Sequence, residues 1–124
     1  MNPAEKRRFL KKANFLDLTP VRIHPHEIRD DGLVTILMPR FKSVYLARMF
    51  QPKGKEPFIR IKLDKYGSAV WLFSDGTSTV GNICTKLTEH NPSLSSDPAE
   101  TEARVTKFLS QLYLQRYITF REIE

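Results

Sequence analysis

Cysteine is almost absent from this chain of 124 residues, in which Cys84 stands alone. A single cysteine excludes a disulfide within the chain and a metal site built from several cysteines. Because Cys84 falls on the apolar stripe of an expected helix, we expect it to be a small buried hydrophobic residue. A reactive thiol is the alternative interpretation.

Long apolar runs are also absent. No stretch approaches the roughly 20 apolar residues that a membrane-spanning helix needs. Residues 1–12 are charged, and they are not followed by the apolar segment of a signal peptide. The expected location is therefore the cytoplasm. The length predicts one ordinary domain with a modest core.

Signatures of catalysis are missing as well. The five glycines form no phosphate-binding loop, and the sequence has no Walker motif, His-Glu-x-x-His, Gly-x-Ser-x-Gly or Cys-x-x-Cys. The carboxylates are scattered, with no pair beside a base. His24 and His26 lie two residues apart, but no third metal ligand is near them. We expect no metal site, no cofactor and no enzymatic activity.

Acidic residues are scarce in the first half of the chain. Residues 1–65 hold fifteen Lys or Arg against seven Asp or Glu, whereas residues 66–124 hold five against seven, and the formal net charge is +6. A basic half suggests an acidic partner, such as nucleic acid, an anionic lipid surface or an acidic peptide. Ordinary solvated surface charges explain the same pattern equally well.

The features that are present centre on residues 58–87. Ile59–Leu63 alternates aliphatic and cationic residues, which predicts a strand with one solvated face. After Asp64, which is suited to cap a helix, apolar residues recur at helical spacing up to residue 73. Trp71 and Leu72 widen that stripe, so we expect this helix to be mostly buried.

A second helix is predicted directly after the first. Asp75-Gly76 is expected to end the first helix, because glycine readily takes the left-handed conformation found just past helix ends. Thr79 is suited to cap the second helix. The apolar stripe of this second helix consists of Val80, Ile83, Cys84 and Leu87.

The flanking segments complete the predicted fold. Glu27–Arg29 and Leu33–Met38 surround Asp30-Asp31-Gly32, which is typical of a hairpin. Asp97-Pro98 starts a third helix that runs to about residue 114 or 115. Residues 117–123 alternate and predict a closing strand. The fold class is therefore α+β and winged-helix-like, with antiparallel strands, three helices and a short final strand.

These residues carry a resemblance to a known family. Leu63, the run Trp71-Leu72-Phe73-Ser74-Asp75-Gly76-Thr77-Ser78-Thr79-Val80, and then Ile83 and Leu87 resemble the PqqD family. Residues 105–112 with Tyr117-Ile118 resemble its closing helix and strand, and the resemblance covers roughly residues 27–120. The chain departs from the family at Arg116, where the family often has glycine. A long basic stretch at residues 40–57 also precedes the central strand.

The resemblance implies a function. PqqD-like domains are recognition elements that hold the leader of a ribosomally made precursor peptide and present it to a modifying enzyme, often a radical-SAM enzyme. The family's groove lies between the third strand and the third helix, which correspond here to residues 58–63 and 102–115. The peptide-binding residues that this implies are Ile59, Arg60, Ile61, Lys62, Arg104, Lys107, Phe108 and Gln111. Core packing for Phe108 and a solvated face for Arg60 and Lys62 are the structural alternatives.

Two other interpretations stay open. A winged-helix DNA-binding protein is the alternative function, although the third helix begins with acidic residues and follows a long loop. An interaction subunit that docks on a larger protein through residues 6–12 or 40–55 is compatible with peptide binding. We expect residues 1–20 to form a basic extension, either frayed, docked, or amphipathic against a membrane or partner, and residues 21–124 to form the domain. Residues 40–57 are expected to pack on the sheet rather than bind single-stranded nucleic acid.

Overall fold

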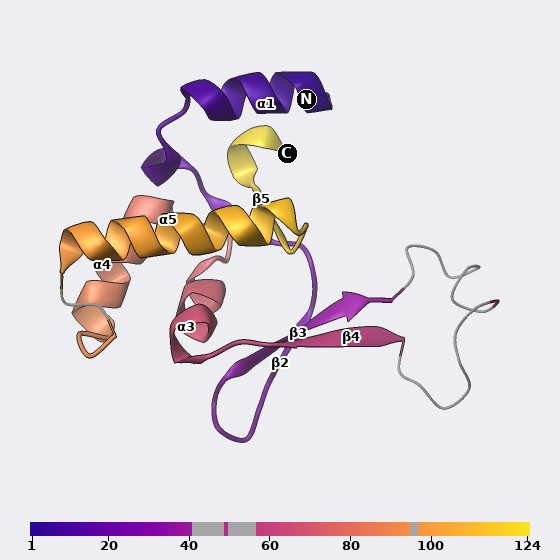
Figure 1. Ribbon diagram of the computed structural model, residues 1–124, viewed down its shortest axis with the longest axis vertical. Helices are drawn as coiled ribbons and strands as arrows, with labels where there is room; N and C mark the ends of the chain where they lie inside the picture. The colour runs from indigo at the N-terminus through magenta and orange to yellow at the C-terminus, as the bar shows by residue number, and fades with distance from the viewer. Residues whose placement is uncertain (41–48, 50–56, 95–96) are drawn as a thin grey trace.

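The computed structural model describes residues 1–40, 49, 57–94 and 97–124. After an N-terminal helix, these residues form antiparallel strands, then three helices and a short closing strand (Figure 1). This order confirms the predicted α+β, winged-helix-like class. The prediction that residues 40–57 pack on the sheet falls mainly on 41–48 and 50–56, which lie outside the described residues.

The larger sheet has three antiparallel strands in the order β2-β3-β4, with β2 at His26–Ile28, β3 at Val34–Pro39 and β4 at Phe58–Lys62. Each predicted strand is present and displaced by one residue. The turn between β2 and β3 contains Gly32, whose φ of +83° is the left-handed conformation that favours glycine. In Figure 1, β3 and β4 reach outward from the helices as a two-stranded ribbon.

Arg29 ties together the end of this sheet that lies next to the helices. Its guanidinium donates hydrogen bonds to the carbonyl oxygens of Val34 (2.7 Å) and Leu63 (2.9 Å) and to Thr35 Oγ1 (3.1 Å). These bonds connect the β2–β3 turn to the point where β4 passes into the next helix. The start of that helix is therefore fixed relative to the sheet.

Three helices follow the sheet, with α3 at Lys65–Phe73, α4 at Val80–His90 and α5 at Pro98–Leu114. Each begins at a side-chain oxygen that accepts a hydrogen bond from a backbone N–H of the first turn. The three pairs are Asp64 with Gly67 (2.7 Å), Thr79 with Asn82 (3.2 Å) and Asp97 with Ala99 (3.1 Å). All three predicted caps are confirmed.

Two details of the sequence-based prediction are wrong. Leu72 is 41% exposed rather than buried, because it lies off the face of α3 that meets the core. The closing strand β5 covers only Ile118–Phe120, because the chain then turns into the short helix η2 at Arg121–Ile123.

A second, two-stranded sheet was not expected from the sequence. It pairs β1 (Pro20–Arg22) with β5 in antiparallel register. The short helix η1 (Phe15–Asp17) precedes β1, and the Phe15 ring meets the Phe120 ring edge-on at 5.5 Å between centroids. Leu18 is 2% exposed. The division of the chain at residue 20 stays a prediction.

The N-terminal helix α1 (Pro3–Lys12) has no buried residue, but Phe9, Leu10 and Ala13 pack partly against the core. Figure 1 places it beside the C-terminal end of the chain. The fully buried side chains of the core come from β3, α3, α4, α5, β5 and η2. Its largest fully buried residues are Trp71, Phe120, Ile36, Ile83, Leu87, Leu109, Ile118, Ile123, Val34, Val70, Val80 and Val105. Among the described helices, none is long and apolar enough to cross a membrane.

Candidate functional site

Strand β4 lies at an edge of its sheet. It pairs with β3 on one side, and the described part of the sheet has no strand on its other side. An edge strand leaves backbone N–H and C=O groups available for pairing with another extended chain. The edge of β4 is therefore a place where a peptide can add as a further strand.

A hollow of about 310 Å³ lies where β4 ends and α5 passes. Four of the residues predicted for the site line it, all of them on α5. The lining residues are Asp64, Tyr66, Gly67, Arg104, Lys107, Phe108 and Gln111. The structure thus brings Arg104, Lys107, Phe108 and Gln111 together at one place. Arg104 and Lys107 add positive charge to it, while Phe108 is half-buried against the core.

The four strand residues of the predicted site lie outside this hollow. Ile61 is half-buried against the core and Ile59 is 43% exposed. Because side chains alternate along a strand, Arg60 and Lys62 point to the face opposite Ile61. Arg60 Nη1 donates to Glu27 Oε2 at 2.6 Å, an ion pair between β4 and β2. The two strand cations therefore belong to a different face from Arg104 and Lys107.

Gly67 lets α5 approach α3 closely. A Cβ atom at this position would lie 3.2 Å from Phe108 Cζ and 3.2 Å from Asp64 Oδ1, which is tighter than ordinary packing. Gly67 and Asp64 were not predicted as site residues. A glycine beside a cap residue at the start of a helix is the sequence signal that was available for them.

Tyr66 and Arg104 stack on each other at the end of the hollow. The Arg104 guanidinium carbon lies 3.9 Å from the centre of the Tyr66 ring, within the range of a cation–π interaction. Burial raises the pKa of Tyr66 to about 12, and Arg104 acts in the opposite direction. The tyrosine is consequently neutral at physiological pH. Tyr66 was not predicted as a site residue, because its place in the apolar stripe of α3 indicates core packing rather than a use for its hydroxyl group.

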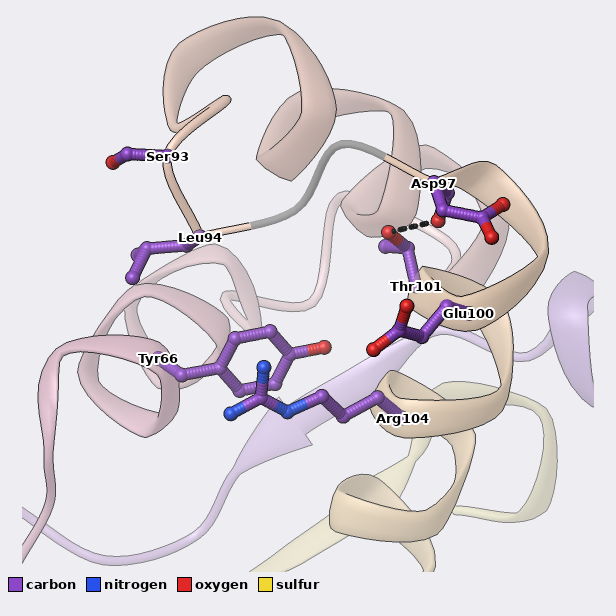
Figure 2. Close-up of a pocket in the computed structure, with 7 residues that line it drawn as sticks. All are labelled: Tyr66, Ser93, Leu94, Asp97, Glu100, Thr101 and Arg104. Carbon is purple, nitrogen blue, oxygen red and sulfur yellow. Dashed lines mark hydrogen bonds between the residues drawn. The ribbon is translucent and has the colours of Figure 1, made fainter.

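A second, smaller hollow lies on the other side of this stack. It measures about 90 Å³ and is lined by Tyr66, Ser93, Leu94, Asp97, Glu100, Thr101 and Arg104 (Figure 2). Tyr66 and Arg104 line both hollows. Their stack separates the larger hollow beside β4 and α5, which we call the groove, from the smaller hollow at the start of α5.

The residues considered for metal binding have other partners. His24 Nε2 lies 2.9 Å from the carbonyl oxygen of Arg116, and the ring of His26 meets Trp71 edge-on at 6.1 Å between centroids. Burial, and secondly Arg22, lowers the pKa of His26. In the described residues no group of three His, Cys, Asp or Glu is placed to hold a metal. Cys84 is buried as predicted, and burial raises its pKa to about 11.

The Asp75-Gly76-Thr77 run, which carries much of the family resemblance, has a structural role. Asp75 Oδ1 accepts hydrogen bonds from the Thr77 N–H (2.9 Å) and hydroxyl group (2.6 Å), and these bonds lower the pKa of Asp75. The Gly76 N–H donates to the carbonyl oxygen of Pro20 at 3.0 Å. The run joins α3 to β1 and lines neither hollow beside α5.

Comparison with known proteins agrees with this arrangement. The family model described as coenzyme PQQ synthesis protein D (PqqD) matches residues 58–118, a span that includes β4, α3, α4 and α5. No curated protein matches the chain, and no solved structure matches it either. The matched residues contain the groove and helices α3, α4 and α5 around it, so the similarity to the PqqD family lies in this part of the chain.

Proposed function

We propose that this protein holds the leader of a ribosomally made precursor peptide and presents it to a modifying enzyme. Proteins of the PqqD family are non-catalytic peptide chaperones, which supports a binding role. The observation that carries the proposal is the open edge of β4 beside the hollow on α5. An extended peptide is held by backbone pairing along β4 and by side chains placed against α5.

The chemistry of the groove favours a leader with acidic or polar and apolar side chains. Arg104 and Lys107 attract carboxylates, Gln111 offers an amide, and the exposed part of Phe108 offers an apolar contact. Backbone pairing with β4 supplies affinity for any extended chain, so the selection of a particular leader falls to these side chains. Arg60 and Lys62 lie on the other sheet face. In the proposal they contact only that part of the peptide which pairs with the edge of β4.

The modifying enzyme needs a surface of its own on this protein. Helix α1 carries Lys6, Arg7, Arg8, Lys11 and Lys12, with Glu5 as its acidic residue, and none of its residues is buried. We propose that this basic helix docks on an acidic surface of the enzyme. Complementary charge speeds encounter and fixes orientation at such an interface.

DNA binding, the alternative function, finds little support. Residues 91–97 separate α4 from α5, a connection longer than the three to four residues usual in a helix-turn-helix. The first turns of α5 carry Glu100 and Glu102 after the cap Asp97, and these carboxylates repel phosphate. Tight, sequence-selective DNA binding at physiological salt would reverse this ranking.

The proposal is tested by capture of partners followed by a binding measurement. The tagged full chain is incubated with nuclease-treated lysate of its own source, and the eluate is analysed by mass spectrometry with short peptides retained. We expect a small precursor peptide, with or without its modifying enzyme. Binding that appears only when nucleic acid is left in the lysate would contradict the proposal.

The captured peptide then tests the groove itself. Lys107→Glu reverses a charge beside the hollow, and we expect its affinity for the peptide to fall about fivefold to tenfold, because one exposed charge contact is worth about 1 kcal/mol. Isothermal titration measures the effect. Lys11→Glu makes the same charge change on α1 and should leave the affinity unchanged. Equal affinities for Lys107→Glu and the wild type would place the peptide elsewhere.

A further inference from the structure

The hydroxyl group of Tyr66 is buried beside the start of α5. Tyr66 is 6% exposed, and its Oη has no hydrogen-bond partner among the residues that the structure describes. A buried hydroxyl without a partner costs free energy, so such groups are uncommon and call for an explanation. The phenylalanine side chain would fill the same apolar stripe without this cost.

The hydroxyl faces the smaller hollow at the start of α5. In Figure 2 the Tyr66 oxygen points toward the first turns of α5, where Glu100 and Thr101 lie, and the Arg104 guanidinium lies across the tyrosine ring. Thr101 Oγ1 donates to the carbonyl oxygen of Asp97 at 2.8 Å, as the dashed line shows. The volume of about 90 Å³ is enough for a few waters or for one small polar group.

The polar groups around the hollow select the chemistry of a ligand. Tyr66 and Arg104 supply donors, whereas Glu100 supplies a carboxylate. A carboxylate ligand would be repelled by Glu100. An ammonium ligand would be repelled by Arg104 and has no lone pair to accept from the Tyr66 hydroxyl. A primary carboxamide has both a carbonyl acceptor and an N–H₂ donor, and it carries no charge.

We propose that this hollow binds the carboxamide of an Asn or Gln side chain of the leader peptide. The carboxamide oxygen accepts from the Tyr66 hydroxyl, and its N–H₂ group donates to Glu100. The inference rests on the proposed function. It names a second side-chain site next to the groove, since a peptide lying along α5 reaches the small hollow across the Tyr66–Arg104 stack that lines both. The raised pKa of Tyr66 keeps its hydroxyl protonated and able to donate.

The site is tested first with a small probe that needs no peptide. The full chain, labelled with ¹⁵N, is titrated with acetamide, acetate and methylammonium at millimolar concentrations and followed by NMR. We expect acetamide alone to give saturable shifts at Glu100, Thr101 and Arg104. Tyr66→Phe should weaken acetamide binding about tenfold, the loss expected for one hydrogen bond.

A matched control separates this role from a structural one. Tyr113→Phe removes a hydroxyl from α5 outside the hollow and should leave acetamide binding unchanged. Tyr66→Phe should be as stable as the wild type or more stable, because the hydroxyl has no hydrogen-bond partner among the described residues. Equal shifts from all three probes, or none from acetamide, would mean that the hollow holds only solvent and would overturn the proposal.

A random peptide library displayed on phage then links the site to the function. We expect selected peptides to share an Asn or Gln at a fixed position, and we expect selection on Tyr66→Phe to lose that preference. Peptides that depend on Lys107 but show no carboxamide preference would overturn this inference and leave the proposed function standing. If acetamide bound but no peptide were selected, the proposed function would fail, and the assignment of the site to a leader would fail with it.

Discussion

Arg116 is the residue whose backbone conformation is least expected from its identity. Its φ of +64° lies in the left-handed region, where a side chain is strained and glycine is favoured. The strain is accepted because the turn completes the end of α5. The Tyr117 N–H donates to the carbonyl oxygen of Leu112 at 2.9 Å, and the Arg116 N–H donates to that of Tyr113 at 3.0 Å. This pair of bonds is a Schellman motif.

We predict that Arg116→Gly raises the free energy of unfolding by roughly 0.5–1 kcal/mol, because glycine relieves the strain at positive φ. Urea denaturation followed by circular dichroism measures the change. Gln115→Gly is the control: Gln115 has φ of −86°, so glycine there should lower stability. A loss of stability in Arg116→Gly would show that the side chain itself holds the turn.

At the scale of elements, the connection between α3 and α4 contains a glycine, Gly76, that a larger residue cannot replace without strain. Gly76 has φ of +84°, and a Cβ atom there would lie 3.0 Å from Arg121 Nη2 and 3.4 Å from Val21 Cγ2. Gly32 has φ of +83°, but a Cβ there would meet no atom within 4 Å. The two glycines thus share a backbone conformation and differ in their surroundings.

This pair predicts a measurable difference between two substitutions. Gly32→Ala should cost about 1 kcal/mol, the price of a side chain at positive φ. Gly76→Ala should cost more, because its Cβ also crowds the Arg121 guanidinium. Thermal and urea unfolding of both variants measure the costs. Equal costs would mean that the Arg121 side chain moves aside freely and that only the backbone matters at Gly76.

Glu122 connects two elements far apart in sequence. Its carboxylate accepts from the Thr19 N–H (2.7 Å) and hydroxyl group (2.9 Å), which ties η2 to the segment before β1. Burial acts to raise the pKa of Glu122, but the hydrogen bonds from Thr19 outweigh it, and the pKa lies below its usual value of 4.5. The stabilisation from this carboxylate is therefore present above about pH 4.5 and is lost as pH falls through the lowered pKa.

We predict that Glu122→Gln lowers the free energy of unfolding at pH 7 by about 1 kcal/mol, and that this penalty shrinks as the pH falls through the lowered pKa of Glu122, because the wild-type carboxyl then becomes protonated as well. Urea unfolding at a series of pH values from 7 downward measures the dependence. Glu124→Gln removes a charge from an exposed residue nearby and serves as the control. A penalty for Glu122→Gln that stayed constant with pH would attribute the effect to packing rather than to the charge.

For the whole molecule, the proposed functions lie on separate surfaces. The groove is formed by β4, α3 and α5, while the basic helix α1 lies beside the C-terminal end of the chain (Figure 1). Peptide and enzyme are therefore expected to bind at the same time. Changing the charge of α1 should therefore weaken binding of the enzyme and leave the affinity for the peptide unchanged.

We predict that the double variant Lys11→Glu, Lys12→Glu keeps its affinity for the captured peptide and recovers less modifying enzyme from lysate, because the reversed charges repel an acidic surface. Quantitative mass spectrometry of the two eluates compares enzyme recovery. Raising the salt concentration during capture should reduce recovery by the wild type in the same direction. Unchanged enzyme recovery would place the docking surface away from α1.

Local sequence determined most of the secondary structure of this protein. Asp64, Thr79 and Asp97 mark the helix starts because a short side chain satisfies backbone donors within the same turn. The turn at Gly32 follows from a similarly local preference, because glycine readily takes a positive φ. The residues of α5 that share the groove, from Arg104 to Gln111, were identifiable because a helix places them on one side and the family resemblance indicated which helix.

The tertiary structure decided what no local pattern encodes. The pairing of β1 with β5 joins residues about a hundred positions apart. Each strand has only three residues, and no periodicity in either sequence indicates which strand it pairs with. Arg60 and Arg104 were both predicted for the groove, but the alternation of side chains and the register of β4 put Arg60 on the other sheet face, where it pairs with Glu27. The packing of α3 against α5 likewise decides that the Tyr66 hydroxyl is buried with no hydrogen-bond partner among the described residues, because burial and hydrogen bonding depend on neighbours that only packing supplies.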